Sequence, residues 1–243
     1  MSRYVPLSLE KFTGLRWTRF TDYRHAVNMH MVPVTLPETG PAAACLVTVF
    51  ARHQDSIGFY ALTGLEPNVS LCIDANNKWM PSYTPAMLRT HPFVLSSPSN
   101  ARAGQMALCA DIESPWVGKN AQLEFHTPEG GLAPEVAPVF EFLKDMEKHR
   151  RAMQHALSAI AESGILVPWD AGEIPGLYRV DERKLGSLEN ESFLTLRKNG
   201  ALAIVYAQMF STNHLPWLKQ RHKQMQGKKI DWSLEEDDIF RFT

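Results

Sequence analysis

The first half of the chain contains short apolar stretches separated by turn-forming residues. Residues 43–50 (AACLVTVF) form a continuous apolar run with β-branched side chains, which is typical of a strand covered on both faces. Residues 57–62 (IGFYAL) follow, and Gly, Pro and Asn residues lie between such segments. The same reasoning predicts further strands at residues 15–20, 25–34, 69–73, 105–110 and 122–125. Residues 1–130 are therefore expected to be β-rich.

The hydrophobic period changes at Pro134. Apolar residues then recur at steps of three and four, which predicts an amphipathic helix of about seven turns over about residues 135–163. Ser163 and Gly164 supply a helix stop, because glycine adopts a positive φ without a Cβ clash. The apolar positions of this helix are Val136, Val139, Phe140, Leu143, Met146, Met153, Leu157 and Ile160.

The remaining chain combines one strand-like segment with further helices. Residues 176–180 read as a strand, and residues 191–198 and 216–226 as helices. Residues 201–210 (ALAIVYAQMF) favour a helix, although periodicity alone leaves a buried strand open. Strands first and helices later predict an α+β fold. In it, a mainly antiparallel sheet from the N-terminal half is covered by the long helix and the C-terminal helices.

The length of 243 residues suits one domain with a well-buried core. We expect a single domain over residues 1–243, β-rich over 1–130, helical over 134–226, and ending in a charged tail over 227–243. Two closely packed units are the alternative. The segment LCID before Trp79 and the segment LCAD before Trp116 echo each other, either through duplication or by chance.

Composition and charge narrow the classes of partner. The chain is 44% hydrophobic and 21% charged with a formal net charge of −1, so no global field favours nucleic acid or an anionic membrane. No apolar run approaches the roughly 18 residues of a membrane span, and the N-terminus lacks the apolar core of a secretory signal. Cys45, Cys72 and Cys109 form no Cys-x-x-Cys pair, which indicates reduced thiols in a cytoplasmic protein.

One set of residues has the composition of a metal site. His53 and Asp55 are two apart, so on one strand they point to the same side, and His126 follows downstream. Two histidines and a carboxylate are the ligands of non-haem iron oxygenases. No arginine between His126 and His149 is available to hold a co-substrate carboxylate, and residues 51–56 also read as a polar loop. This enzyme remains an alternative. The main expectation is a protein without a cofactor or catalytic residues.

Residues 79–95 (WMPSYTPAMLRTHPFVL) are called the crossing segment below. Its three prolines remove backbone donors, so it predicts a rigid crossing with a helical turn at 86–89 that enters a strand at Phe93. Trp, Tyr and Arg are the usual anchors of interfaces. We therefore predict binding residues at Trp79, Tyr83, Arg89, His91 and Trp116. The alternative is a packed structural crossing in which Arg89 bonds loop carbonyls.

The end of the chain separates its charges. The segment KQRHKQMQGKK is basic, whereas SLEEDDIFRFT is acidic and carries two aromatic residues. As a docking peptide, it would insert Ile239, Phe240 and Phe242 into a groove while the acidic residues set the orientation. The alternative is a solvated tail whose two halves attract each other weakly.

The crossing segment also carries a family resemblance. Its Trp79, its YTPA at 83–86, its Arg89 and its PFVL at 92–95 resemble the W…Y-x-P-A…R…P-F-x-L signature of the SapC family. Other segments agree in order, and the resemblance covers about residues 20–222. They are Gly64, Leu65 and Asn68, then LCAD at 108–111, GILVP at 164–168, VDERKL at 180–185, GALAIVYA at 200–207 and Ser211.

The resemblance implies a bacterial protein. The family takes its name from a protein associated with paracrystalline surface layers, and its members are described as surface-layer-related or as peptide-transport components. A permease role conflicts with the lack of a spanning segment in this chain. The family often has His where this chain has Gln208, so a shared metal or acid–base role at that position is in doubt.

These observations favour a soluble, non-enzymatic accessory or binding protein that acts on a peptide or protein partner. The metal-dependent enzyme at His53, Asp55 and His126 is the first alternative. A structural surface-layer component, which would assemble with itself, is the second, and a homo-oligomer stays open.

Overall fold

The computed structural model describes residues 3–53, 56–96 and 105–239, with the backbone alone for 53 and 228–239. The strands are β1 (Tyr4–Pro6), β2 (Arg16–Trp17), β3 (Met31–Pro33), β4 (Val47–His53), β5 (Ser56–Leu62), β6 (Phe93–Ser96), β7 (Ala107–Asp111), β8 (Val117–Gly118), β9 (Leu123–Glu124), β10 (Leu166–Pro168) and β11 (Leu177–Val180). The helices are α1 (Leu9–Phe12), α2 (Thr39–Ala43), α3 (Ala86–Arg89), α4 (Ala137–Glu162), α5 (Glu182–Gly186), α6 (Asn190–Lys198), α7 (Ala201–Ser211) and α8 (Leu215–Ile239). Short 3₁₀ turns are η1 (Arg24–Ala26), η2 (Leu36–Glu38) and η3 (Thr212–His214).

The largest sheet has the strand order β10-β11-β4-β5-β3 and is antiparallel throughout. Its centre is the pair β4 and β5, which are aligned from Val47 opposite Leu62 to His53 opposite Ser56. The strand predicted at 176–180 is confirmed as β11, which pairs with β4 at Leu177 and so joins the sheet of the N-terminal half. The apolar run at 43–50 gives β4 its buried residues, because helices cover the sheet.

The other strands form two small sheets, in the orders β1-β7-β6 and β8-β2-β9. The fold class is α+β as predicted, but the prediction of one sheet is wrong. Trp17, Phe93 and Phe125 pack edge-on or tilted in a second core between these sheets, with Trp17 and Phe93 centroids 4.9 Å apart. Strands of two to five residues, separated by long loops, gather around this aromatic centre instead of extending the large sheet.

Residues 69–73 were expected to form a strand, and that prediction is wrong. The Ser70 N–H donates to Val27, the Leu71 N–H donates to Thr63, and the Cys72 carbonyl accepts from Met80. Because these backbone groups bond three separate segments, no neighbour supplies a continuous ladder. The 25–34 segment likewise forms a strand only over β3, after the turn η1.

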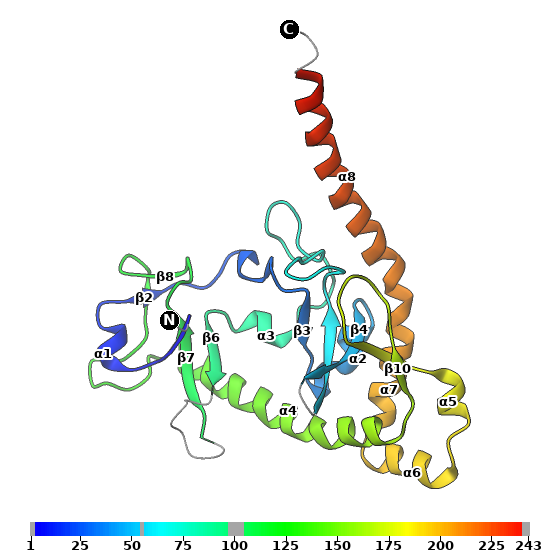
Figure 1. Ribbon diagram of the computed structural model, residues 1–243. Coiled ribbons are helices and arrows are strands. Elements are labelled where there is room, and N and C mark those ends of the chain that lie inside the picture. The colour runs from blue at the N-terminus through cyan, green and yellow to red at the C-terminus, as the bar shows by residue number, and fades with distance from the viewer. Residues whose placement is uncertain (1–2, 54–55, 97–104, 240–243) are drawn as a thin grey trace.

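Helix α4 confirms the long helix predicted at about 135–163. Its 26 residues span about 39 Å at 1.5 Å per residue. Figure 1 shows it passing beneath both groups of strands. The C-terminal half buries Met153 and Ile160 in the main core, whereas the N-terminal half buries Leu143 in the second core. One helix therefore covers both cores.

The C-terminal helices close the main core. Residues 201–210 are helical rather than a strand, and Gly200 precedes α7 with a φ of 69°. Helix α8 begins close to the predicted start and continues to Ile239, pointing away from α4 (Figure 1). Among the described residues, no helix is both long enough and apolar enough to cross a membrane.

A buried carboxylate fastens the crossing segment to the sheet. Thr35 and Glu38 form a capping box around η2: Oε2 of Glu38 accepts the Thr35 N–H at 2.9 Å and the Thr35 hydroxyl at 2.6 Å. Oε1 accepts the Tyr83 hydroxyl at 3.0 Å and the Ala86 N–H at 2.6 Å. Glu38 is only 4% exposed, and these four donors replace its hydration. Burial, and then the Glu38 carboxylate, raise the pKa of Tyr83 to about 12.

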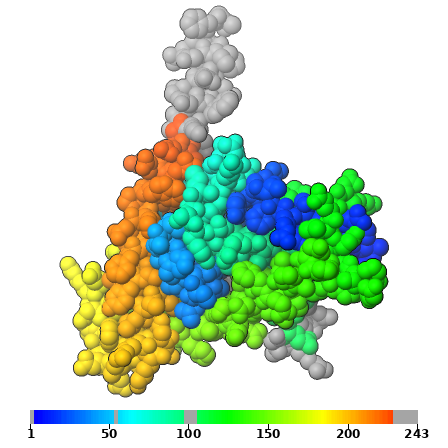
Figure 2. Space-filling model, turned by 180° about the vertical axis from the view of Figure 1, so that it is seen from behind, coloured from blue at the N-terminus to red at the C-terminus, as the bar shows by residue number. Residues whose placement is uncertain are grey.

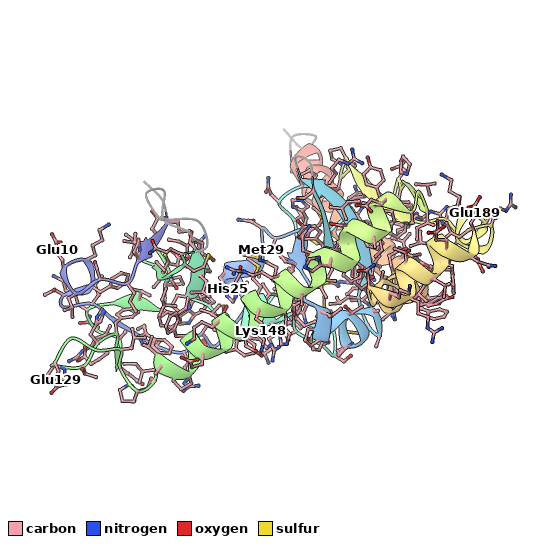
Figure 3. All side chains as sticks on the ribbon, turned by 90° about the horizontal axis from the view of Figure 1, so that it is seen from below. Glu10, His25, Met29, Glu129, Lys148 and Glu189 are labelled. Atoms are coloured by element: carbon pink, nitrogen blue, oxygen red, sulfur yellow. The ribbon has the colours of Figure 1, made fainter. Side chains whose placement is uncertain are left out.

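The Glu38 contacts predict a stability difference. In Glu38→Gln, an amide NH₂ would face N–H or O–H donors, so we expect the free energy of unfolding to fall by about 1–3 kcal/mol. Tyr83→Phe removes only one of the four donors to Glu38, so it should lower the free energy of unfolding by a smaller amount. Urea denaturation at neutral pH measures both, with Glu129→Gln as the control because Glu129 is exposed at one end of the molecule (Figure 3). Equal stability of Glu38→Gln and the unmodified chain would contradict this role.

Candidate functional site

The crossing segment adopts the local structure that its sequence predicts. The helical turn expected at 86–89 is α3, and the strand expected at Phe93 is β6. Trp79 Nε1 donates to the Tyr83 carbonyl at 2.8 Å, which closes the loop before α3. The segment thus runs from the main core to the small β1-β7-β6 sheet and is held at both ends.

Arg89 joins the crossing segment to α4. Its guanidinium lies over the Tyr83 ring at 5.9 Å and over the Phe142 ring of α4 at 5.4 Å. The alternative, in which Arg89 bonds loop carbonyls, is therefore replaced by two cation–π contacts. Arg89 is exposed and Phe142 is 38% exposed, so this pair lies on the surface.

Two adjoining hollows, with volumes of about 340 and 220 Å³, follow α4 on the described surface. They share Leu95 and Glu147, so we treat them as one groove, called the α4 groove. Its walls come from α4, β6, α3 and the end of β3. The lining residues are Pro33, Val34, Thr35, Met87, Thr90, Val94, Leu95, Met106, Phe140, Leu143, Lys144, Met146, Glu147, Lys148, Arg150 and Arg151.

The α4 groove has an apolar floor and a basic rim. Four cationic side chains and one carboxylate line the groove, namely Lys144, Lys148, Arg150, Arg151 and Glu147, and Lys144 also bonds Glu141 beside the groove at 2.6 Å. Arg150 bonds Glu147 at 2.6 Å and Arg151 bonds it at 2.8 Å, and the Arg150 bond above all lowers the pKa of Glu147. Figure 3 shows Lys148 near the middle of α4. Such a surface suits an apolar segment that carries negative charge.

Sequence reasoning missed this groove. From the sequence, α4 was expected only to be an amphipathic helix, and no role was given to its basic residues Lys144, Lys148, Arg150 and Arg151. Residues three or four positions apart lie on one side of a helix. The helical spacing of Phe140 and Met146 from those basic residues was therefore the sequence signal for this groove. The Thr35-x-x-Glu38 capping box was a second missed signal.

A histidine pair lies behind the crossing segment. The rings of His25 and His91 stack with centroids 4.1 Å apart and planes 13° apart, and Trp116 meets both rings edge-on. His91 Nε2 lies 2.8 Å from the Ser114 hydroxyl, and His25 Nε2 lies 3.3 Å from the Leu88 carbonyl. The pair therefore links η1, the crossing segment and the turn after β7.

The surroundings keep both imidazoles neutral. Burial lowers the pKa of His25, while burial and then the neighbouring His25 lower the pKa of His91 to about 3. Within the described residues, His25 Nδ1 is buried without a hydrogen-bond partner. The contact of His91 with Ser114 resembles a base and nucleophile, but Ser114 is 3% exposed and its hydroxyl also accepts the Trp116 N–H at 3.2 Å. This contact holds a turn in place.

Three of the five predicted binding residues, Trp79, His91 and Trp116, lie in one row of ring contacts. Trp79 contacts Tyr23 at 5.9 Å, Tyr23 contacts His25 at 5.8 Å, and His25 leads through His91 to Trp116. His91 and Trp116 are each 7% exposed, Trp79 and Tyr83 are half-buried, and Arg89 is exposed. Of these predicted residues, only Arg89 is exposed. The binding role of the set stays a prediction.

The predicted metal ligands are only partly described. Asp55 and the His53 side chain lie outside the described residues, and His126 forms a backbone bridge with Leu132 near the second core. In the part of the chain that the structure describes, no group of three His, Cys, Asp or Glu residues could hold a metal ion. The tail residues Phe240 and Phe242 also lie outside the described residues, and Ile239 is described by its backbone alone.

Gln208 connects β11 and β4 at the point where these two strands separate. Its Oε1 accepts the Val180 N–H at 2.9 Å, and its Nε2 donates to the Thr48 carbonyl at 3.3 Å. The side chain is fully buried on α7. An amide supplies both the acceptor and the donor that these strand ends require. Gln208 therefore joins α7 to the sheet.

Comparison with known proteins fits this geometry. The sequence model of the SapC family matches residues 7–218. The chain belongs to the SapC family. The match includes both cores, the crossing segment and α4, and it ends at the first turn of α8, so residues 219–243 lie beyond it. Searches of curated proteins and of solved structures each returned no match for this SapC chain.

The neutral state of His91 predicts a pH dependence of stability. The pKa of His91 is about 3 in the folded chain and about 6.5 in the unfolded chain. Between these two pH values, His91 takes up a proton only in the unfolded chain. The free energy of unfolding should therefore fall as pH decreases below 6.5, by up to about 1.4 kcal/mol per pH unit from this group.

Urea denaturation between neutral and mildly acidic pH measures the slope, and His91→Gln should make it shallower. His155→Gln is the matched control, because His155 lies on the exposed face of α4. An unchanged slope in His91→Gln would remove His91 as the source.

Proposed function

We propose that this SapC-family protein is a non-enzymatic accessory or binding protein that recognises a peptide or protein partner through the α4 groove. The observation that carries the proposal is the combination of an apolar floor with four cationic side chains against one carboxylate. A partner segment that fits would carry apolar side chains next to acidic ones.

The physical basis of such binding is divided between floor and rim. Apolar partner residues that pack on the floor are removed from water. Their burial contributes about 25 cal/mol of binding free energy per Å² of buried surface. The rim attracts acidic residues and fixes the direction of the segment, which contributes more to specificity and association rate than to affinity. Because the rim charges are exposed, added salt should weaken the binding.

Arg89 extends this surface beyond the groove. It is exposed on the crossing segment, and it stacks on Phe142, which follows Glu141 on the same helix that supplies the rim. The row of buried aromatic and histidine residues behind it restricts the movement of the crossing segment. An arginine that is already positioned loses less conformational entropy when a partner binds. This supports a binding role for Arg89 and a supporting role for His91 and Trp116.

We also place this function in the cytoplasm. Cys45, Cys72 and Cys109 are all within the described residues and all are free thiols. Burial raises the pKa of Cys72 and of Cys109, which keeps these two thiols protonated and unreactive. A reducing compartment suits a chain that forms none of its possible disulfides.

The experiment uses a photo-crosslinking amino acid in the producing organism. Placed at Met106 in the groove or at Phe142 beside it, the crosslinker should yield one defined adduct, whereas placement at the exposed Leu194 on α6 should not. Mass spectrometry identifies the partner segment, which we expect to combine acidic and apolar residues.

Arg89→Ala should then weaken binding of that partner on the order of tenfold without lowering the melting temperature. Arg197→Ala, at an exposed site on α6, is the matched control. Undiminished binding by a stably folded Arg89→Ala variant would confine the crossing segment to a structural role. The absence of any groove-specific adduct would refute the proposed function itself.

A further inference from the structure

The acidic tail, residues 233–243 (SLEEDDIFRFT), has the chemistry that the α4 groove fits. It carries four consecutive carboxylates followed by two phenylalanines and an isoleucine. The groove offers four cations beside an apolar floor. The acidic residues of the tail therefore match the cations of the groove, and its apolar residues match the apolar floor. The four carboxylates of the tail are Glu235, Glu236, Asp237 and Asp238.

The direction of α8 decides which groove the tail can reach. The 25 residues of α8 span about 37 Å at 1.5 Å per residue. Figure 1 shows α8 leaving the fold on the side opposite α4, and Figure 2 shows from behind the coloured start of α8, in orange, rising away from the green surface of α4. Residues 233–239 of the tail are the far end of α8 itself, so they cannot reach α4 of the same copy unless the helix breaks. The groove of another copy has no such constraint.

We propose that the acidic tail of one copy docks in the α4 groove of a second copy. This inference rests on the proposed function, because it names an occupant for the same groove. The contact joins two different surfaces, so it closes into a dimer where both tails engage reciprocally and otherwise extends from copy to copy. A tail in the groove also competes with any other partner segment for that site.

Two groove residues are the best points of contact for the carboxylates. Among the described residues, Lys148 forms no ion pair within 4.0 Å, and Arg151 shares its only such partner, Glu147, with Arg150. Both side chains are exposed on α4 and are three residues apart, so they lie on one side of the helix. Reversal of these two charges removes attraction at the rim and leaves the apolar floor unchanged.

The test is a charge swap in the full chain, followed by sedimentation equilibrium at low ionic strength. The groove variant is Lys148→Glu with Arg151→Glu, and the tail variant is Glu235→Lys with Glu236→Lys. We expect the unmodified chain to self-associate. Each variant alone should weaken self-association by about tenfold or more, and their combination should restore it to within about threefold. Circular dichroism confirms that each variant is folded.

The matched control is Lys219→Glu with Lys223→Glu, which makes the same charge change on exposed residues of α8. This control should associate like the unmodified chain. If it loses association while the groove variant keeps it, the tail pairs with the basic part of α8 in another copy, and the proposal is overturned.

A labelled peptide SLEEDDIFRFT provides a second measurement. Fluorescence anisotropy should show that it binds the tail variant, whose own groove is unoccupied, and that it does not bind the groove variant. A chain that stays monomeric and leaves the peptide unbound would overturn the tail contact. The crosslinked partner at Met106 would persist in that case, so the failure of this inference is distinguishable from failure of the proposed function.

Discussion

A carboxylate in a protein interior is stable only where hydrogen-bond donors take the place of water, and Glu38 is 4% exposed. Its four donors come from η2 and from the crossing segment. The position of α3 follows from this, because the Ala86 N–H is one of the donors. Arg89, the groove wall at Met87 and Thr90, and the start of β6 all continue from α3. The candidate site is thus placed by one anion in the interior.

The histidine pair complements that anion on the other side of the crossing segment. Glu38 accepts four hydrogen bonds, whereas burial lowers the pKa of His25 and of His91. The crossing segment therefore lies between a hydrogen-bonded buried carboxyl group and two buried imidazoles.

Periodicity predicted the regular elements well. The long apolar repeat located α4, and the run at 57–62 located β5. The run at 43–50 located β4 only from Val47, because Ala43 ends helix α2 and a turn follows it. The division into three sheets did not follow, since Trp17, Phe93 and Phe125 meet only through tertiary packing. In the candidate site, Arg89 was selected from residue type and its binding role stays a prediction, whereas the groove depends on which side of α4 meets β6. The stacking of His25 on His91 joins residues 66 positions apart, a pairing that one sequence does not encode locally.

Helix α4 has one half in each core, and this affects how the molecule opens. Loss of the small sheets would strip the cover from Leu143, and loss of the large sheet would do the same for Ile160. Because α4 is one continuous hydrogen-bonded helix, loss of the cover over one half would also destabilise the other half. The groove follows α4 from Phe140 to Arg151, where the helix passes from the second core toward the main core. An occupant would therefore stabilise a region next to both cores and couple their stabilities.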